Sequence, residues 1–218
     1  MTRELSAPLP FKSLLMPAIV TLAVTLLRLT GELQGWSPRL FGDVGGGGAV
    51  VGIVWLVPLF GVYFAWKLER SGGSPRAARV VGHALCALAI VIVSAATAGL
   101  VLKLTQTAQF GVVMLTGLAA AWVAYRGFPA LGRTLFVYGL AARVPVAIVM
   151  LAAIFANWHT HYNAPPPGFP EMAPLAKWFF IGFIPQMFLW IPFTMIVGAV
   201  FGGLTLLVVG HGRQPGTA

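Results

Sequence analysis

Long apolar runs alternate along this chain with short segments of glycine, proline, serine and charged residues. A helix of about 20 apolar residues can cross the roughly 30 Å hydrocarbon core of a bilayer. The sequence therefore predicts membrane-spanning helices near residues 12–34, 48–67, 80–103, 108–126, 134–157 and 175–209. The expected fold is an all-α, polytopic transmembrane helix bundle of about six spans, which forms one integral membrane domain over residues 1–218.

The composition favours the same class of protein. Of the 218 residues 58% are hydrophobic and only 9% are charged, whereas about 25% are charged in a typical soluble domain. The basic residues that give the net charge of +9 lie mostly in short loops between the apolar runs. They form no basic patch with interleaved aromatic residues, so we expect the lipid bilayer, and no nucleic acid, as the main partner.

The distribution of lysine and arginine predicts an orientation, because cytoplasmic loops carry an excess of these residues. If the first loop is external, nine of the fourteen are cytoplasmic and three, Arg39, Lys103 and Lys177, are external. Arg28 and Arg143 fall within spans. This bias predicts an even number of spans in a multi-pass membrane protein with both termini in the cytoplasm.

The last apolar run, 175–209, is longer than one span requires and contains Pro185, Gln186 and Pro192. It fits either a short interfacial helix that bends at Pro185 into the true span, or one long, kinked helix. We favour the bent arrangement, because Pro185 removes a backbone hydrogen bond and Gln186 offers a polar side chain beside the gap. If both pieces crossed the bilayer, the count would be seven.

A short sequence similarity suggests an internal repeat. AIVTLA at 18–23 recurs as AIVMLA at 147–152, and a proline, Pro58 or Pro192, interrupts the following span in each half. These features predict a weak parallel repeat of spans one and two in spans five and six. The same offset makes Glu32 equivalent to His161. The alternative is chance similarity between apolar segments.

Arg28 and Glu32 lie near the end of the first span and are four residues apart, so they share one helix face and can form an ion pair. Charges within a span usually face protein or water and often mark function. The pair is therefore either structural or part of a substrate site.

Arg143 lies about 14 Å into the fifth span by helical rise, too deep for its side chain to reach the interface easily. Either Glu32 reaches it, or it binds a group that this chain does not supply, such as the carboxylate or phosphate of a small anionic solute. Arg28, Glu32 and Arg143 are accordingly the candidate substrate-binding residues.

The histidines suggest two further sites. His159 and His161, with Glu32 from the first loop, predict a possible three-ligand metal site on the external face; plain interfacial polarity is the alternative. His83 and His211 lie at the cytoplasmic ends of their spans, which is too shallow for paired haem ligands. The sequence therefore leaves the cofactor unknown.

Two segments carry glycines four residues apart, Gly48 with Gly52 and Gly198 with Gly202. This spacing permits close helix contact, either within the chain or with a second copy or another membrane subunit.

Three functions fit the sequence. The first is a small-solute or ion transporter with a site between helices near Arg28, Glu32 and Arg143. The second is a non-catalytic subunit or scaffold of a larger membrane complex. The third is an intramembrane or metal-dependent enzyme with an external-face site. The in-membrane arginines favour transport.

Overall fold

The computed structural model describes residues 7–42 and 50–210, and all regular secondary structure in this part of the chain is helical, with no β-strand. The elements are α1 (Phe11–Leu33), α2 (Leu56–Gly72), α3 (Ala77–Ala96), η2 (Thr97–Val101), α4 (Gln106–Gly127), α5 (Pro129–Phe155), α6 (Pro174–Lys177), η3 (Trp178–Phe183), η4 (Gln186–Trp190) and α7 (Ile191–Gly210). Here η denotes π-helical turns.

Five segments of the described chain are long and apolar enough to cross a membrane, which supports an integral membrane protein. They are Phe11–Leu33, Ala77–Val101, Gln106–Gly127, Pro129–Phe155 and Pro174–Val209. Each overlaps a predicted span. Proline begins α5 and α6 at a position where a helix needs no backbone donor.

The predicted span 48–67 was misplaced. Residues 50–55 form bends and a turn, and α2 begins only at Leu56 and has 17 residues, so it is not among the five segments. Gly52 lies among the bends, and its conformational freedom disfavours a helix there. Pro58 lies in the first turn of α2, where a missing N–H costs little, so it does not interrupt the helix.

The bent arrangement expected for 175–209 was also wrong, because the backbone stays helical from Pro174 to Gly210. Two π-helical segments flank Pro185, and Pro192 lies in the first turn of α7. The wider π-helical turns let the helix continue although Pro185 has no backbone N–H to donate. At 1.5 Å per residue such a helix is about 54 Å long, well beyond the roughly 30 Å hydrocarbon core.

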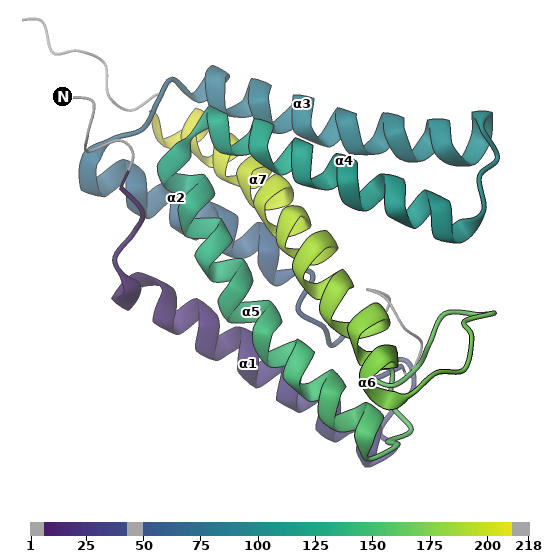
Figure 1. The fold of residues 1–218 in the computed structure, drawn as a ribbon. Coiled ribbons are helices and arrows are strands. Elements are labelled where there is room, and N and C mark those ends of the chain that lie inside the picture. Colours follow the sequence, from purple (N-terminus) through teal and green to yellow (C-terminus); the bar gives the residue numbers. More distant parts are fainter. Residues whose placement is uncertain (1–6, 43–49, 211–218) are drawn as a thin grey trace, which may run out of the picture.

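Figure 1 shows α7 running diagonally between the α3–α4 pair and the α1–α5 pair. Helices that follow one another run in opposite directions, so the connections lie at two ends of the bundle. The end with the α2–α3 and α4–α5 connections, where α1 also starts, carries seven of the twelve lysine and arginine residues of the described chain: Lys12, Lys67, Arg70, Arg76, Arg79, Arg126 and Arg133. The side of the membrane that each end faces, like the proposed repeat, stays a prediction.

Small residues allow α2 and α7 to pack closely. A Cβ atom on Gly61 of α2 would lie 2.5 Å from the carbonyl oxygen of Gly198 on α7. A Cβ on Gly202 would meet Leu131 at 2.8 Å and Ala65 at 3.1 Å. The predicted Gly198 and Gly202 spacing therefore serves packing within the chain.

The other predicted small-residue pair lies only partly within the described residues. Gly52 precedes α2, and Gly48 lies outside the described residues. Contact with another copy or subunit through these glycines stays a prediction.

Candidate functional site

Arg28, Glu32 and His161 form one hydrogen-bonded group, here called the Glu32 cluster. Arg28 Nε donates to Glu32 Oε1 at 2.8 Å, as the spacing of four residues permits. The His161 backbone N–H donates to Glu32 Oε2 at 2.9 Å, and His161 Nδ1 lies 2.5 Å from Oε1. Arg28 Nη2 also donates to the carbonyl of Gly42 at 3.0 Å. One buried carboxylate thus joins the end of α1 to the loop after α5.

The histidine of the Glu32 cluster is held neutral. Burial, aided by the Arg28 charge, lowers the pKa of His161, although its hydrogen bond to Glu32 acts in the opposite direction. A neutral ring that donates from Nδ1 to the carboxylate leaves a lone pair on Nε2. Next to it, burial raises the pKa of Tyr162, so its hydroxyl stays protonated.

Buried polar side chains continue from the Glu32 cluster along the contact between α1 and α5. Tyr162 donates through its hydroxyl to the Thr25 carbonyl at 3.2 Å, and Thr25 Oγ1 donates to the Thr21 carbonyl at 2.9 Å. The hydroxyls of Thr21 and Tyr138 are 2.8 Å apart. These four residues, the polar ladder, are all buried. Hydrogen bonding of this kind satisfies polar side chains between membrane helices.

Arg143 lies on α5 between Tyr138 and the helix end next to the Glu32 cluster, and it is 3% exposed. Its guanidinium carbon is 4.7 Å from the centre of the Trp190 ring, and its charge acts on the Tyr138 hydroxyl. Its Nε is buried without a hydrogen-bond partner. Arg143 has no ion pair with Glu32, whose carboxylate is occupied by Arg28 and His161. Of the two alternatives, the first is therefore not seen in the described residues, and the binding of an anionic group by Arg143 stays a prediction.

Gln186 supplies a second unsatisfied polar group in the region where η4 packs against α5. Its Nε2 lies 3.6 Å from Met150 Sδ, while its Oε1 is buried without a partner. Gln186 and Trp190 are about one helical turn apart, and Arg143 and Met150 are two turns apart on α5. The Gln186–Met150 and Trp190–Arg143 contacts can therefore belong to one interface. Two orphaned polar atoms in one apolar interface are unusual, since buried polar atoms are normally paired.

The predicted metal ligands do not come together as a three-ligand site. Glu32 contacts His161, but the described residues contain no group of three His, Cys, Asp or Glu side chains that could hold a metal ion. His159 is exposed. Metal binding by His159 and His161 stays a prediction. Of the histidines considered for haem, His83 contacts the Arg79 carbonyl and His211 lies outside the described residues.

Sequence reasoning missed the polar ladder and the Arg143 neighbours. One signal was present, because Thr21, Thr25, Arg28 and Glu32 follow one another at spacings of four, three and four residues and so share a face of α1. Trp190 and Gln186 gave no comparable signal, since their proximity to Arg143 depends on how η4 packs against α5.

No protein family model, curated protein or solved structure matches this chain.

Proposed function

We propose that this multi-pass membrane protein carries a small anionic solute across the bilayer and binds it at Arg143, between α5 and η4. The observation that carries the proposal is the buried guanidinium with an unpaired Nε and no acidic partner among the described residues. An unpaired charge within a span costs about 2.5–3.5 kcal/mol on insertion scales. A bound carboxylate, phosphate or inorganic anion would compensate for this cost through charge-assisted hydrogen bonds.

The polar ladder supports a route for the solute or for a coupled proton. It extends from the Glu32 cluster to Tyr138, whose hydroxyl is within reach of the Arg143 charge. The Glu32 cluster lies at the end of this route near the α5–α6 connection (Figure 1). In this proposal Arg143 is the binding group, and Glu32 and Arg28 shape the entrance.

The test is anion flux in liposomes that contain the purified protein. The panel consists of chloride, nitrate, acetate and inorganic phosphate, with protein-free liposomes as the baseline. Arg143→Gln should abolish flux of the transported anion, and Arg143→Lys should retain part of it because it keeps the charge. Arg133→Gln on the same helix removes a charge at an exposed position and is the matched control.

Two results would overturn the proposal. One is the absence of flux for every anion of the panel while the protein is folded. The other is unchanged flux in Arg143→Gln. A partner chain that co-purifies stoichiometrically and brings an acidic residue to Arg143 would instead identify the protein as a subunit of a larger membrane complex.

A further inference from the structure

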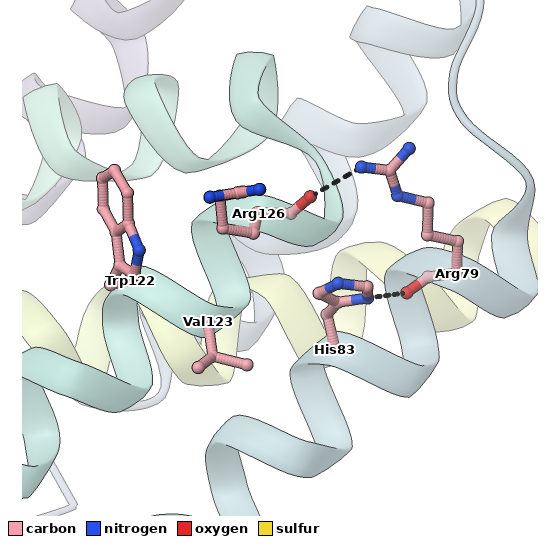
Figure 2. Close-up of a pocket in the computed structure, with 5 residues that line it drawn as sticks. All are labelled: Arg79, His83, Trp122, Val123 and Arg126. Atoms are coloured by element: carbon pink, nitrogen blue, oxygen red, sulfur yellow. Dashed lines mark hydrogen bonds between the residues drawn. The ribbon is translucent and has the colours of Figure 1, made fainter.

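A basic hollow lies between α3 and α4, at the end of the bundle that holds the α2–α3 and α4–α5 connections. It is lined by Arg79, His83, Trp122, Val123 and Arg126 and has a volume of about 330 Å³. Figure 2 shows Arg79 and His83 on α3 beside Trp122 and Arg126 on α4. The residues that line the hollow do not include Arg143, which lies on α5.

The two arginines of this hollow carry charges that the described chain does not neutralise. Arg79 Nη2 donates to the Arg126 carbonyl at 3.0 Å, and His83 Nδ1 donates to the Arg79 carbonyl at 2.9 Å. The Arg126 guanidinium lies 6.0 Å from the Trp122 ring centre and makes no hydrogen bond within the described residues. Neither arginine contacts a carboxylate there. Several N–H donors are therefore free to bind an anion.

An apolar hollow continues along the same side of the α3–α4 pair. It is lined by Ile90, Val93, Ser94, Thr97, Ala98, Leu102 and Val112 and has a volume of about 390 Å³. Ile90 and Ser94 follow His83 by seven and eleven residues, and Val112 precedes Val123 by eleven. These spacings return to nearly the same helix face. The surface therefore changes along one seam from cationic at the helix ends to apolar further in.

The outer surface of α4 beside this seam is also apolar. Trp122, Leu118 and Leu115 are spaced by four and three residues, so they form one stripe, and they are 59%, 42% and 70% exposed. Trp122 lies next to the basic hollow, where tryptophan is expected at the level of lipid headgroups.

We propose that this seam binds an anionic phospholipid, with its phosphate at Arg79 and Arg126 and an acyl chain along the apolar hollow. Basic pockets between membrane helices recognise acidic lipid headgroups in this way. A lipid fits better than a soluble anion, because only a lipid has an acyl chain that can contact the apolar hollow and the Leu115–Trp122 stripe. Arg79 and Arg126 bind the headgroup, and His83 holds Arg79 through its backbone carbonyl.

The test is lipid binding to the full chain, purified and delipidated in detergent, measured by native mass spectrometry. Phosphatidylglycerol and phosphatidylcholine with the same acyl chains are added at equal concentrations. We expect phosphatidylglycerol to bind preferentially, and Arg126→Gln to weaken that binding about fivefold, since each basic residue contributes roughly 1 kcal/mol. Arg79→Gln with Arg126→Gln should reduce it further.

Three comparisons complete the experiment. Arg39→Gln removes one exposed charge at the opposite end of the bundle, as Arg126→Gln does at this end, and should leave binding unchanged. Arg126→Gln is informative even if Arg79→Gln misfolds, because the Arg126 guanidinium makes no hydrogen bond in the described chain. Equal binding of both lipids, equal binding by Arg126→Gln, or displacement of phosphatidylglycerol by millimolar inorganic phosphate would overturn the proposal.

Discussion

His161 Nδ1 lies 2.5 Å from Glu32 Oε1, across 129 residues of sequence. The short contact connects the end of α1 to the loop after α5, and the same carboxylate also binds Arg28. It is the only carboxylate within the five candidate spans of the described chain. Its loss would leave two partners unsatisfied, which makes it a sensitive point of the fold.

Glu32→Gln should lower the free energy of unfolding by about 3 kcal/mol, because the Arg28 charge would stay buried without its counterion. Thermal unfolding in detergent, followed by helical circular dichroism, measures the change. Glu171→Gln removes an exposed carboxylate and is the control. If both variants unfold at the same temperature, the Glu32 cluster does not stabilise the chain.

Stability should fall as the pH decreases from 7.5 to 5.5. The pKa of His161 in the fold is below its ordinary value of 6.5, so between these two values the unfolded chain binds a proton that the folded chain does not. The stabilisation is complete above about pH 6.5 and decreases as the pH falls toward the folded pKa. Unfolding temperatures across this range measure the effect.

The matched variants for this pH experiment are His161→Asn and His159→Asn. The first should flatten the pH dependence, and the second, at an exposed position, should leave it as it is. A chain that becomes more stable on acidification would show instead that His161 is charged in the fold.

Gly61→Ala should destabilise the protein by about 1–3 kcal/mol or more, as overpacking does. The added Cβ would lie 2.5 Å from the Gly198 carbonyl oxygen, which is backbone and cannot rotate away. Gly82→Ala, in α3 with nothing within 4 Å of its Cβ, should be neutral or slightly stabilising. Equal unfolding temperatures for the two variants would contradict the close α2–α7 contact.

Arg143→Met should raise the unfolding temperature even though it removes the proposed binding group. An unpaired buried charge opposes folding, and methionine fills a similar volume without it. Arg133→Met, at an exposed position, is the control. A marked loss of stability in Arg143→Met would indicate that the packing of Arg143 against Trp190 stabilises the fold and that the arginine has a structural role.

The sequence predicted α1, α3, α4 and α5 well, because the length of an apolar run is closely constrained by the bilayer. It could not locate the start of α2, since the residues before Leu56 are as apolar as the residues of a membrane-spanning helix. It also treated Pro185 as a break, whereas π-helical turns keep the chain helical there. Hydropathy measures transfer into lipid and does not distinguish these local conformations.

The candidate site was predictable only where its residues are close in sequence. The Arg28 and Glu32 pair follows from a spacing of four residues. The contacts of Arg143 with Trp190 and of Met150 with Gln186 depend on packing between residues that are more than 30 positions apart in the sequence. The spacing of Thr21 and Thr25 places them on the same face of α1 as Arg28 and Glu32, but it does not identify Tyr138 and Tyr162 as their partners.

If α2 crosses the membrane as the predicted second span, its shortness makes this fold dependent on the thickness of the bilayer. With 17 residues α2 is about 25 Å long, less than the roughly 30 Å that lipid chains usually occupy. Its close contact with α7 prevents it from moving freely to compensate. Thicker membranes would therefore impose a mismatch, at a cost of fractions of a kcal/mol per Å, and the protein should be most stable among short-chain lipids.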